Sequence, residues 1–359
     1  QRLAELRVSE ATSEYASFCR HRSEHSAVHL LPAVSECTAV QRADRAPALL
    51  KVPVVVPRPK RWCGSDWTMD FWKRSQSNDW WRFRARSPAF EHDKKAADCA
   101  DVEGSASEYV DYARVLQKMD PDCKQDSAVA FPRLSFDSWC PFASGGQELF
   151  KSHWRSLTPP GVKDLSARWM KQFAAVFHLD FLEFFARFFK VSLGAAGSIS
   201  RLHVANHGAH SWYTQTEGKR LFFLFSPREG ANLCEDSGTT CDHPEGYAAL
   251  VSPVDIFYPN AKRHAQFAMA KAQFVVLSPG ETLVIPSGWW RYSVALEASV
   301  TLHHPFWSLE NRSRISEEFR EAFVDEKMPP DLLEMAARNV AQIHEQVLQD
   351  DDDDSDLDG

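Results

Sequence analysis

Apolar residues follow two different patterns along this chain. Between residues 194 and 307 they form short runs bounded by turn residues, whereas segments before and after this region show helical spacing. In Phe274–Pro286 a Pro-Gly pair separates two apolar runs, which predicts a strand, a turn and a second strand. Residues 220–227, 291–296 and 299–304 predict three more strands. Short strands framed by helices favour a β-barrel or sandwich with helical wrapping.

Helical spacing predicts helices over residues 107–119 and 162–177, and again after Pro329. The last helix carries an apolar stripe of residues spaced mainly three and four positions apart: Leu332, Leu333, Ala336, Val340, Ile343 and Val347. A stripe of this kind packs either on its own body or on a second copy of the chain. We therefore take this helix as the candidate surface for a homodimer.

The composition describes a folded chain with a nearly neutral body and an acidic end. Of the 359 residues, 44% are hydrophobic and 25% are charged, which excludes wholesale disorder. The formal net charge is -8, but the last ten residues hold seven Asp and no Lys or Arg, so the other 349 carry only -1. This excludes a strongly basic nucleic-acid binder, and we expect no nucleic-acid partner.

The sequence shows neither a membrane span nor a metal-binding cysteine pattern. The most apolar stretch, residues 173–193, is interrupted by four charged residues: Asp180, Glu183, Arg187 and Lys190. The eight Cys contain no C-x-x-C pair. We therefore expect reduced thiols in an intracellular protein, in a compartment that the sequence does not indicate.

Two segments carry residues suited to chemistry. Residues 201–220 place His203, His207 and His210 near the end of a predicted strand, and three His within eight residues can bind a metal ion. On a strand-to-loop stretch, side chains at offsets of four and seven need not converge, so this cluster alone does not define a site. The second segment covers residues 279–291 and is rich in Pro, Gly and Trp.

Together these segments resemble the Jumonji-C (JmjC) family of iron(II)/2-oxoglutarate oxygenases, in the cupin superfamily, and above all its small hydroxylase branch. That branch has an H-x-D motif, then Trp and Gly before an aromatic strand that ends in Pro, and later P-G-E-x-x-x-x-P-x-G-W-W-H. The matching positions here are His203, Trp212, Gly218, residues 220–227, Pro279, Gly280, Glu281, Pro286, Gly288, Trp289 and Trp290. The resemblance covers about residues 60–307. It implies a mainly β fold with α, a double-stranded β-helix (JmjC/cupin-like barrel) with flanking helices and a C-terminal helical segment.

At the family's catalytic positions this chain departs from the pattern. The family holds iron(II) on two His and one carboxylate, with open positions for 2-oxoglutarate and oxygen. His203 matches the first His, but Ala205 stands at the carboxylate position and Arg291 at the second His. Ala has no donor atom and Arg stays protonated, so neither binds a metal. The family's 2-oxoglutarate-binding Lys corresponds to Arg220, which can still hold a carboxylate, and an Asn of its last strand corresponds to Pro305.

Three interpretations follow. In the first, the chain is a degenerate JmjC barrel that needs no metal or cofactor and acts as a binding module or scaffold. In the second, it is an active Fe(II)/2-oxoglutarate-dependent protein hydroxylase or demethylase with substitute ligands drawn from His207, His210, His303 and His304. The third compares the H-x-Ala motif with iron/2-oxoglutarate halogenases, where a halide replaces the carboxylate. Those enzymes still need the second His, which Arg291 removes, and our prediction is the first interpretation.

The resemblance also predicts a residual pocket. If Arg220 and Arg291 both point inward, they bring two cations into a largely apolar barrel, and buried charges need counter-charges. One hypothesis is that a dicarboxylate binds there without metal, held by Arg220, Tyr213 and His303. The other is that aromatic side chains fill the barrel: Trp212, Tyr213 and Phe223.

The predicted organisation has four parts. They are an N-terminal extension (residues 1–60), the JmjC/cupin-like domain (61–307), C-terminal helices (308–349) and a disordered acidic tail (350–359). A protein without catalysis would act through protein contacts, so we expect a protein partner or a larger complex. The C-terminal helices, which dimerise several members of the family, are the expected site of a homodimer.

Overall fold

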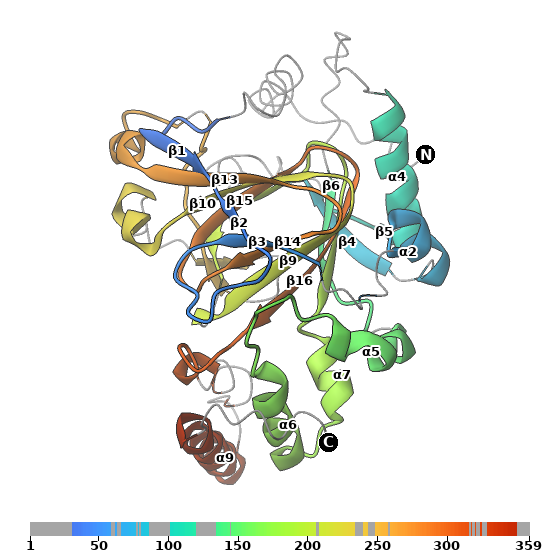
Figure 1. The fold of residues 1–359 in the computed structure, drawn as a ribbon. Coiled ribbons are helices and arrows are strands. Elements are labelled where there is room, and N and C mark those ends of the chain that lie inside the picture. Colours follow the sequence, from blue (N-terminus) through green and yellow to red (C-terminus); the bar gives the residue numbers. More distant parts are fainter. Residues whose placement is uncertain are drawn as a thin grey trace.

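The computed structural model describes residues 31–58, 62, 66–76, 78, 80–85, 101–119, 134–143, 145–205, 208–233, 240–242, 248–257, 259–315, 317, 320, 324 and 329–349. Two twisted sheets face each other and enclose a barrel, and helices gather at one end and along one side of it (Figure 1). This is the barrel with flanking helices and a C-terminal helical segment that the family resemblance implies.

One of the two barrel sheets has five strands in the order β1-β13-β10-β15-β8. The strands are β1 (Glu36–Ala39), β8 (Ile199–Val204), β10 (Arg220–Phe225), β13 (Lys271–Leu277) and β15 (Trp290–Ala295). All neighbours are antiparallel except β1 and β13, which run parallel. This sheet contains the strands that carry His203, Arg220 and Arg291.

The opposite sheet has nine strands in the order β2-β3-β14-β9-β16-β7-β6-β4-β5. The strands are β2 (Gln41–Arg42), β3 (Val54–Pro57), β4 (Trp80–Ala85), β5 (Asp101–Ser105), β6 (Leu134–Trp139), β7 (Lys190–Gly194), β9 (His210–Glu217), β14 (Glu281–Ile285) and β16 (Ser299–Phe306). A separate pair is formed by β11 (Thr240–Asp242) and β12 (Ala248–Leu250). The nine-stranded sheet contributes Tyr213 and His303 to the barrel.

The predicted strands are confirmed with small shifts at their ends. The Pro-Gly turn between β13 and β14 contains Gly280 with φ 89, a left-handed value that glycine adopts without steric cost. Strands β1 to β3 lie before residue 60, in the predicted N-terminal extension, yet β1 pairs with β13, β3 pairs with β14, and β2 pairs with β3. These strands are therefore continuous with the barrel sheets.

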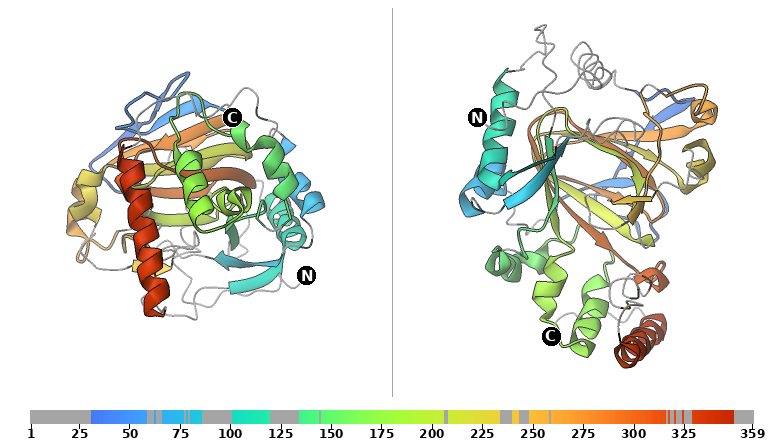
Figure 2. Two further views of the ribbon diagram at one scale, coloured as in Figure 1. Left: turned by 90° about the horizontal axis from the view of Figure 1, so that it is seen from below. Right: turned by 180° about the vertical axis from the view of Figure 1, so that it is seen from behind.

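Helices cover the outer face of the nine-stranded sheet (Figure 2). They are α2 (Met69–Ser75), α4 (Ala106–Met119), α5 (Gln147–His153), α6 (Ser166–Val176), α7 (Phe181–Ala186) and α9 (Pro330–Gln349). The predicted helix over 162–177 begins at Ser166, because the Asp164 carboxylate accepts a hydrogen bond from the Ser166 backbone N–H at 2.9 Å and fixes the turn before it. None of the described helices is long and apolar enough to cross a membrane.

Most of the apolar stripe of α9 is buried within the chain, although Leu332 at its start is exposed. Ala336, Val340, Ile343 and Val347 are its buried residues, and α9 lies beside α6 in both views of Figure 2. The stripe thus packs on its own body, which was one of the two arrangements that its pattern allowed.

Buried side chains form three hydrophobic cores: the barrel interior, a core under the helices and a core on the far side of the five-stranded sheet. The barrel interior holds apolar residues from both sheets: Val55, Tyr213, Phe222, Leu224, Val275, Leu277, Leu283 and Ile285. Trp212 points the other way and packs against Phe189 under the helices, while Phe223 belongs to the core on the far side of the five-stranded sheet. Of the three aromatic residues predicted to fill the barrel, only Tyr213 does so, because neighbours in a strand face opposite sides.

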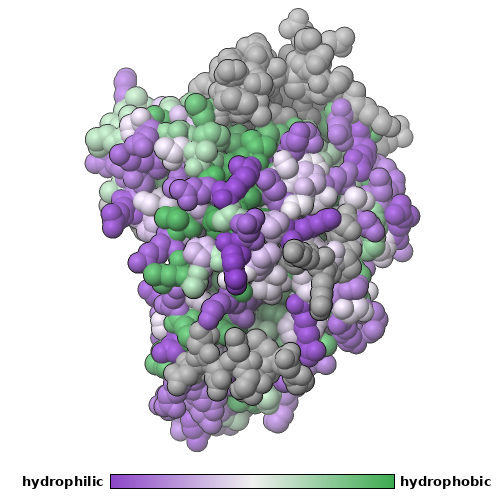
Figure 3. Space-filling view, in the orientation of Figure 1, coloured by the Kyte–Doolittle hydropathy of each residue, from purple (hydrophilic) through white to green (hydrophobic). Residues whose placement is uncertain are grey.

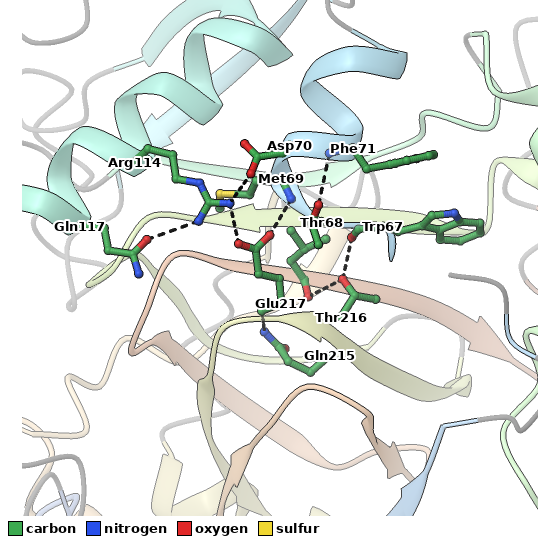
Figure 4. A network of polar contacts seen from close by, with 11 residues as sticks. Trp67, Thr68, Met69, Asp70, Phe71, Arg114, Gln117, Gln215, Thr216 and Glu217 are labelled. Atoms are coloured by element: carbon green, nitrogen blue, oxygen red, sulfur yellow. Dashed lines mark hydrogen bonds and ion pairs between the residues drawn. The ribbon is translucent and has the colours of Figure 1, made fainter. Parts of the chain in front are cut away.

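A polar network joins α2 and α4 to the end of β9 (Figure 4). Arg114 on α4 pairs with Asp70 at 3.1 Å and with Glu217 at 2.6 Å. The second oxygen of Glu217 accepts a hydrogen bond from the backbone N–H of Met69 at 2.7 Å. The carboxylate of Glu217 therefore links α2 and α4 to the end of β9, three residues before Arg220.

Candidate functional site

His203 and Arg291 are cross-strand neighbours inside the barrel. The register between β8 and β15 places Arg291 opposite His203 and Ser293 opposite Ser200. Between these two pairs, β15 has one residue and β8 has two. The extra residue on β8 identifies a β-bulge. Because of this bulge, both Ser200 and His203 face the barrel interior.

The guanidinium of Arg291 makes a direct hydrogen bond to the imidazole of His203. Its Nε donates to Nε2 of His203 at 3.0 Å, and the two side chains are 4% and 3% exposed. On the other side of the ring, Nδ1 lies 2.7 Å from the carbonyl oxygen of Arg201, which can only accept. His203 is therefore a neutral imidazole with its proton on Nδ1 and its lone pair directed at Arg291.

Two residues of β9 complete the binding of Arg291. Its Nη1 donates to the hydroxyl of Ser211 at 3.1 Å, and its guanidinium lies 5.2 Å from the centre of the Tyr213 ring. A cation over an aromatic face is attracted by the ring's negative quadrupole. Arg291 thus spans the barrel from one sheet to the other, and it points inward.

Arg220, Tyr213 and His303 line the same cavity as His203 and Arg291. Arg220 donates from Nη1 to the hydroxyl of Ser293 at 3.3 Å. The rings of Tyr213 and His303 are stacked, with centres 5.2 Å apart and planes inclined by 12°. The cavity volume is ≈ 20 Å³, room for about one water molecule. The structure therefore brings together the residues predicted to form the residual pocket, although little open space remains among them.

The other candidate ligands have different surroundings. His304 faces the helical core, where its nitrogens lie 3.2 Å from the Phe188 carbonyl oxygen and 3.2 Å from a carboxylate oxygen of Asp164. His210 packs on Phe306 and accepts a hydrogen bond at Nδ1 from the backbone N–H of Ser287 at 2.9 Å. Burial lowers the pKa of His210 from 6.5 to about 4. His207 lies outside the described residues.

The donor set does not fit the iron centre that the resemblance implies. Among the described residues, no three His, Cys, Asp or Glu side chains form a group able to hold a metal ion. Ala205 supplies no donor, and Arg291 directs an N–H at the lone pair that His203 would offer to a metal. We therefore derive no chemical step through iron.

Several residues of the site were not among the sequence candidates. Ser211 belongs to the same face of β9 as Tyr213, so strict alternation would have found it. Ser200, Ser293 and Asp137 also line the cavity. Ser200 escapes alternation because the bulge in β8 shifts its face, and bulges have no reliable signal in a single sequence.

Comparisons with known proteins agree with this architecture. The family described as "Cupin-like domain" matches residues 95–311. HSPB1-associated protein 1 of Rattus norvegicus is 29% identical over 105 residues, which cover 29% of this chain and 21% of the relative. The protein of that name from Bos taurus is 26% identical over 127 residues, covering 35% and 25% of the two chains.

A second kind of relative also matches. Lysine-specific demethylase 8 of Xenopus tropicalis is 29% identical over 114 residues, which cover 32% of this chain and 23% of the relative. The matched stretches thus span a quarter or less of these relatives' lengths. The family match covers more than half of the chain and contains strands β5 to β16, and both kinds of relative are JmjC-type proteins. The chain therefore belongs to the JmjC-type, cupin-like domain family.

Proposed function

We propose that this protein is a JmjC-type binding scaffold that has lost Fe(II)/2-oxoglutarate catalysis. The observation that supports this most strongly is the 3.0 Å hydrogen bond from Arg291 Nε to His203 Nε2. It directs a permanent cation at the remaining ligand position, where a metal ion would be repelled and would find no lone pair. No catalytic residue and no metal ligand are assigned.

Charge explains why the barrel accepts this exchange. A site of two neutral His, one carboxylate and Fe²⁺ carries a formal charge of about +1, and so does a neutral His with Ala and Arg. The guanidinium thus replaces the net charge of the metal centre. The surrounding hydroxyl and aromatic groups need not change their polarity.

Metal analysis of the purified protein tests the proposal. We expect no stoichiometric iron and no conversion of 2-oxoglutarate to succinate. Stoichiometric iron, with turnover that is lost in His203→Ala, would refute the scaffold function.

A restored ligand set gives a second test. The double variant Ala205→Asp, Arg291→His supplies two of the missing donors next to His203, so we expect it to bind Co²⁺ with a visible absorption band. The single variant Ala205→Asp is the matched control, since it keeps Arg291 and should show no band. A band in the control would mean that Arg291 does not exclude metal.

The alternative function is an Fe(II)/2-oxoglutarate-dependent protein hydroxylase or demethylase with substitute ligands. It is favoured by one observation, namely that His303 lines the same cavity as His203. It requires Arg291 to leave the imidazole of His203. Turnover that is lost in His303→Ala as well as in His203→Ala would support this alternative.

The residual dicarboxylate pocket is a separate proposal. Arg220, Tyr213 and His303 supply a cation and two aromatic groups, but the cavity of ≈ 20 Å³ holds much less than a five-carbon dicarboxylate. Binding would require the Tyr213 ring to turn away from His303. Calorimetry with 2-oxoglutarate and with succinate tests this, and no heat of binding for either would remove the proposal.

A protein partner is the expected ligand of a scaffold. The name of HSPB1-associated protein 1 describes association with another protein, and we propose that this chain also acts in a complex. Hydrophobic residues form several separate patches between hydrophilic ones on the face seen in Figure 3. These patches do not single out one docking site.

A homodimer through α9 would have to use exposed residues of the helix, including Leu332 at the start of the stripe. Leu332 and Met335 are exposed on α9 and lie one turn apart. The double variant Leu332→Glu, Met335→Glu should convert a dimer to a monomer in light scattering. An unchanged mass would show that this part of α9 makes no dimer contact.

A further inference from the structure

We infer that the small cavity between Arg220 and Arg291 binds a single halide-sized monovalent anion, chloride being the abundant one. This inference rests on the proposed function, since it requires Arg291 to remain in the barrel where iron is absent. Its ligands are guanidinium and hydroxyl groups of the barrel interior.

The charges around the cavity are unbalanced. Among the described residues that line it, the charged groups are the guanidinium groups of Arg220 and Arg291 and the carboxylate of Asp137, an excess of one positive charge. His203 contributes none, because its Nδ1 proton and Nε2 lone pair are both used in hydrogen bonds of the neutral form. Excess charge in a buried site is costly without a counter-ion.

Arg220 is the residue for which this imbalance is clearest. It is 6% exposed, and among the described residues its only hydrogen-bond partner is the neutral hydroxyl of Ser293. Its Nε is buried without a hydrogen-bond partner in the described part of the chain. A buried guanidinium that lines a cavity and has donor capacity left can bind an anion there.

The Nη2 of Arg220 lies beside Gly194. A Cβ placed on Gly194 would lie 2.6 Å from Nη2 and 3.0 Å from the hydroxyl oxygens of Ser198 and Ser299. Both hydroxyls are buried and have no hydrogen-bond partner among the described residues. Gly194 thus leaves room for the guanidinium within a hydroxyl-rich environment that cannot neutralise it.

Hydroxyl groups can complete the coordination of an anion. Ser293 accepts a hydrogen bond from Arg220, so its own proton is available for donation into the cavity, and Ser200 lines the same space. The volume of ≈ 20 Å³ suits a single atom slightly larger than water. Sulfate, phosphate and dicarboxylates would fit this space only if side chains such as Tyr213 moved.

Bromide gives a direct test, because it replaces chloride and scatters X-rays anomalously. Crystals of the full chain grown in sodium bromide should show one anomalous peak in the cavity, within roughly 3.5 Å of a guanidinium nitrogen of Arg220. A cavity that contains only water, or no peak there, would overturn the inference.

Thermal unfolding gives the test in solution. At equal ionic strength, sodium chloride should raise Tm by about 3 °C relative to sodium gluconate, because only the folded state binds the ion. Arg220→Gln should abolish this difference, whereas Arg42→Gln, which removes an exposed arginine, should keep it. An equal chloride effect in Arg220→Gln would contradict the inference, and the bromide experiment decides it if that variant does not fold.

Metal analysis of the same sample separates the two proposals. Iron with 2-oxoglutarate turnover would remove the scaffold function and this inference together. Absence of both iron and bromide would remove only the anion site.

Discussion

The neutral form of His203 depends on a single backbone contact. Because the Arg201 carbonyl holds the ring's proton on Nδ1, Nε2 must act as acceptor, and an arginine is a better donor to it than water. Position 291 therefore determines whether this lone pair serves a metal or a guanidinium. The sequence predicted the loss of ligands at Ala205 and Arg291, but it left open whether Arg291 points inward. Only the register between β8 and β15 answers that question.

Gly218 permits a conformation that no other residue adopts easily. Its φ is 66, and a Cβ there would lie 2.1 Å from the carbonyl oxygen of Ala298. Gly218→Ala should therefore lower the free energy of unfolding by about 2 kcal/mol or more, as measured by urea denaturation. Gly280→Ala is the matched control, since φ is 89 but nothing lies within 4 Å, and it should cost only about 1 kcal/mol. Equal losses would show that backbone strain alone determines the effect.

His210 should make the protein sensitive to acid. Its pKa is lowered from 6.5 to about 4 by burial, so between these values the unfolded chain binds a proton that the folded protein does not. The free energy of unfolding should therefore be highest above pH 6.5 and fall as the pH drops towards 4, by up to roughly 3 kcal/mol. In His210→Gln the slope over this range should be smaller. The same slope in both proteins would assign the acid sensitivity to other groups.

At the scale of elements, periodicity predicted the strands and helices well and their faces less well. The aromatic run of β10 and the Pro-Gly turn before β14 carry strong local signals, and both elements form where expected. One hypothesis placed Trp212 and Phe223 in the barrel interior. Their strands are buried on both faces at these positions, so a period of two does not tell which face is the interior. The choice is made by the opposing layers, which no local pattern describes.

The packing of the buried stripe of α9 can be tested by comparing a buried and an exposed residue of this helix. Ile343 is 0% exposed and packs in the core shared with α6, whereas Met335 on the same helix is 47% exposed. Ile343→Ala should lower the free energy of unfolding by about 2–4 kcal/mol, and Met335→Ala should change it by less than about 0.5 kcal/mol. Chemical denaturation at several protein concentrations measures both. A loss at Ile343 that grows on dilution would indicate that a second chain covers this face.

At the scale of the whole molecule, the segment before residue 60 is part of the barrel sheets. β1 runs parallel to β13, and β3 pairs antiparallel with β14, so one segment extends both sheets. Short strands without a turn signature are hard to recognise in a sequence, and the resemblance begins only near residue 60. The barrel closes with residues that the family pattern does not contain.

A chain that starts at residue 61 should therefore be less stable than the full chain, because it lacks strands of both barrel sheets. Without β3, the edge of β14 and the apolar interior beside Leu283 would face solvent, and unpaired strand edges associate. We expect this truncated protein to aggregate in size-exclusion chromatography, whereas the full chain should elute as one species.

Point variants separate the effect of packing in the barrel interior from the effect of strand pairing. Val55→Asp places a charge in the barrel interior and should unfold the protein, but Val52→Asp changes an exposed residue and should not. A soluble, folded protein from residue 61 onward would show that the barrel is stable without β1 to β3, and that these strands only cover its edges.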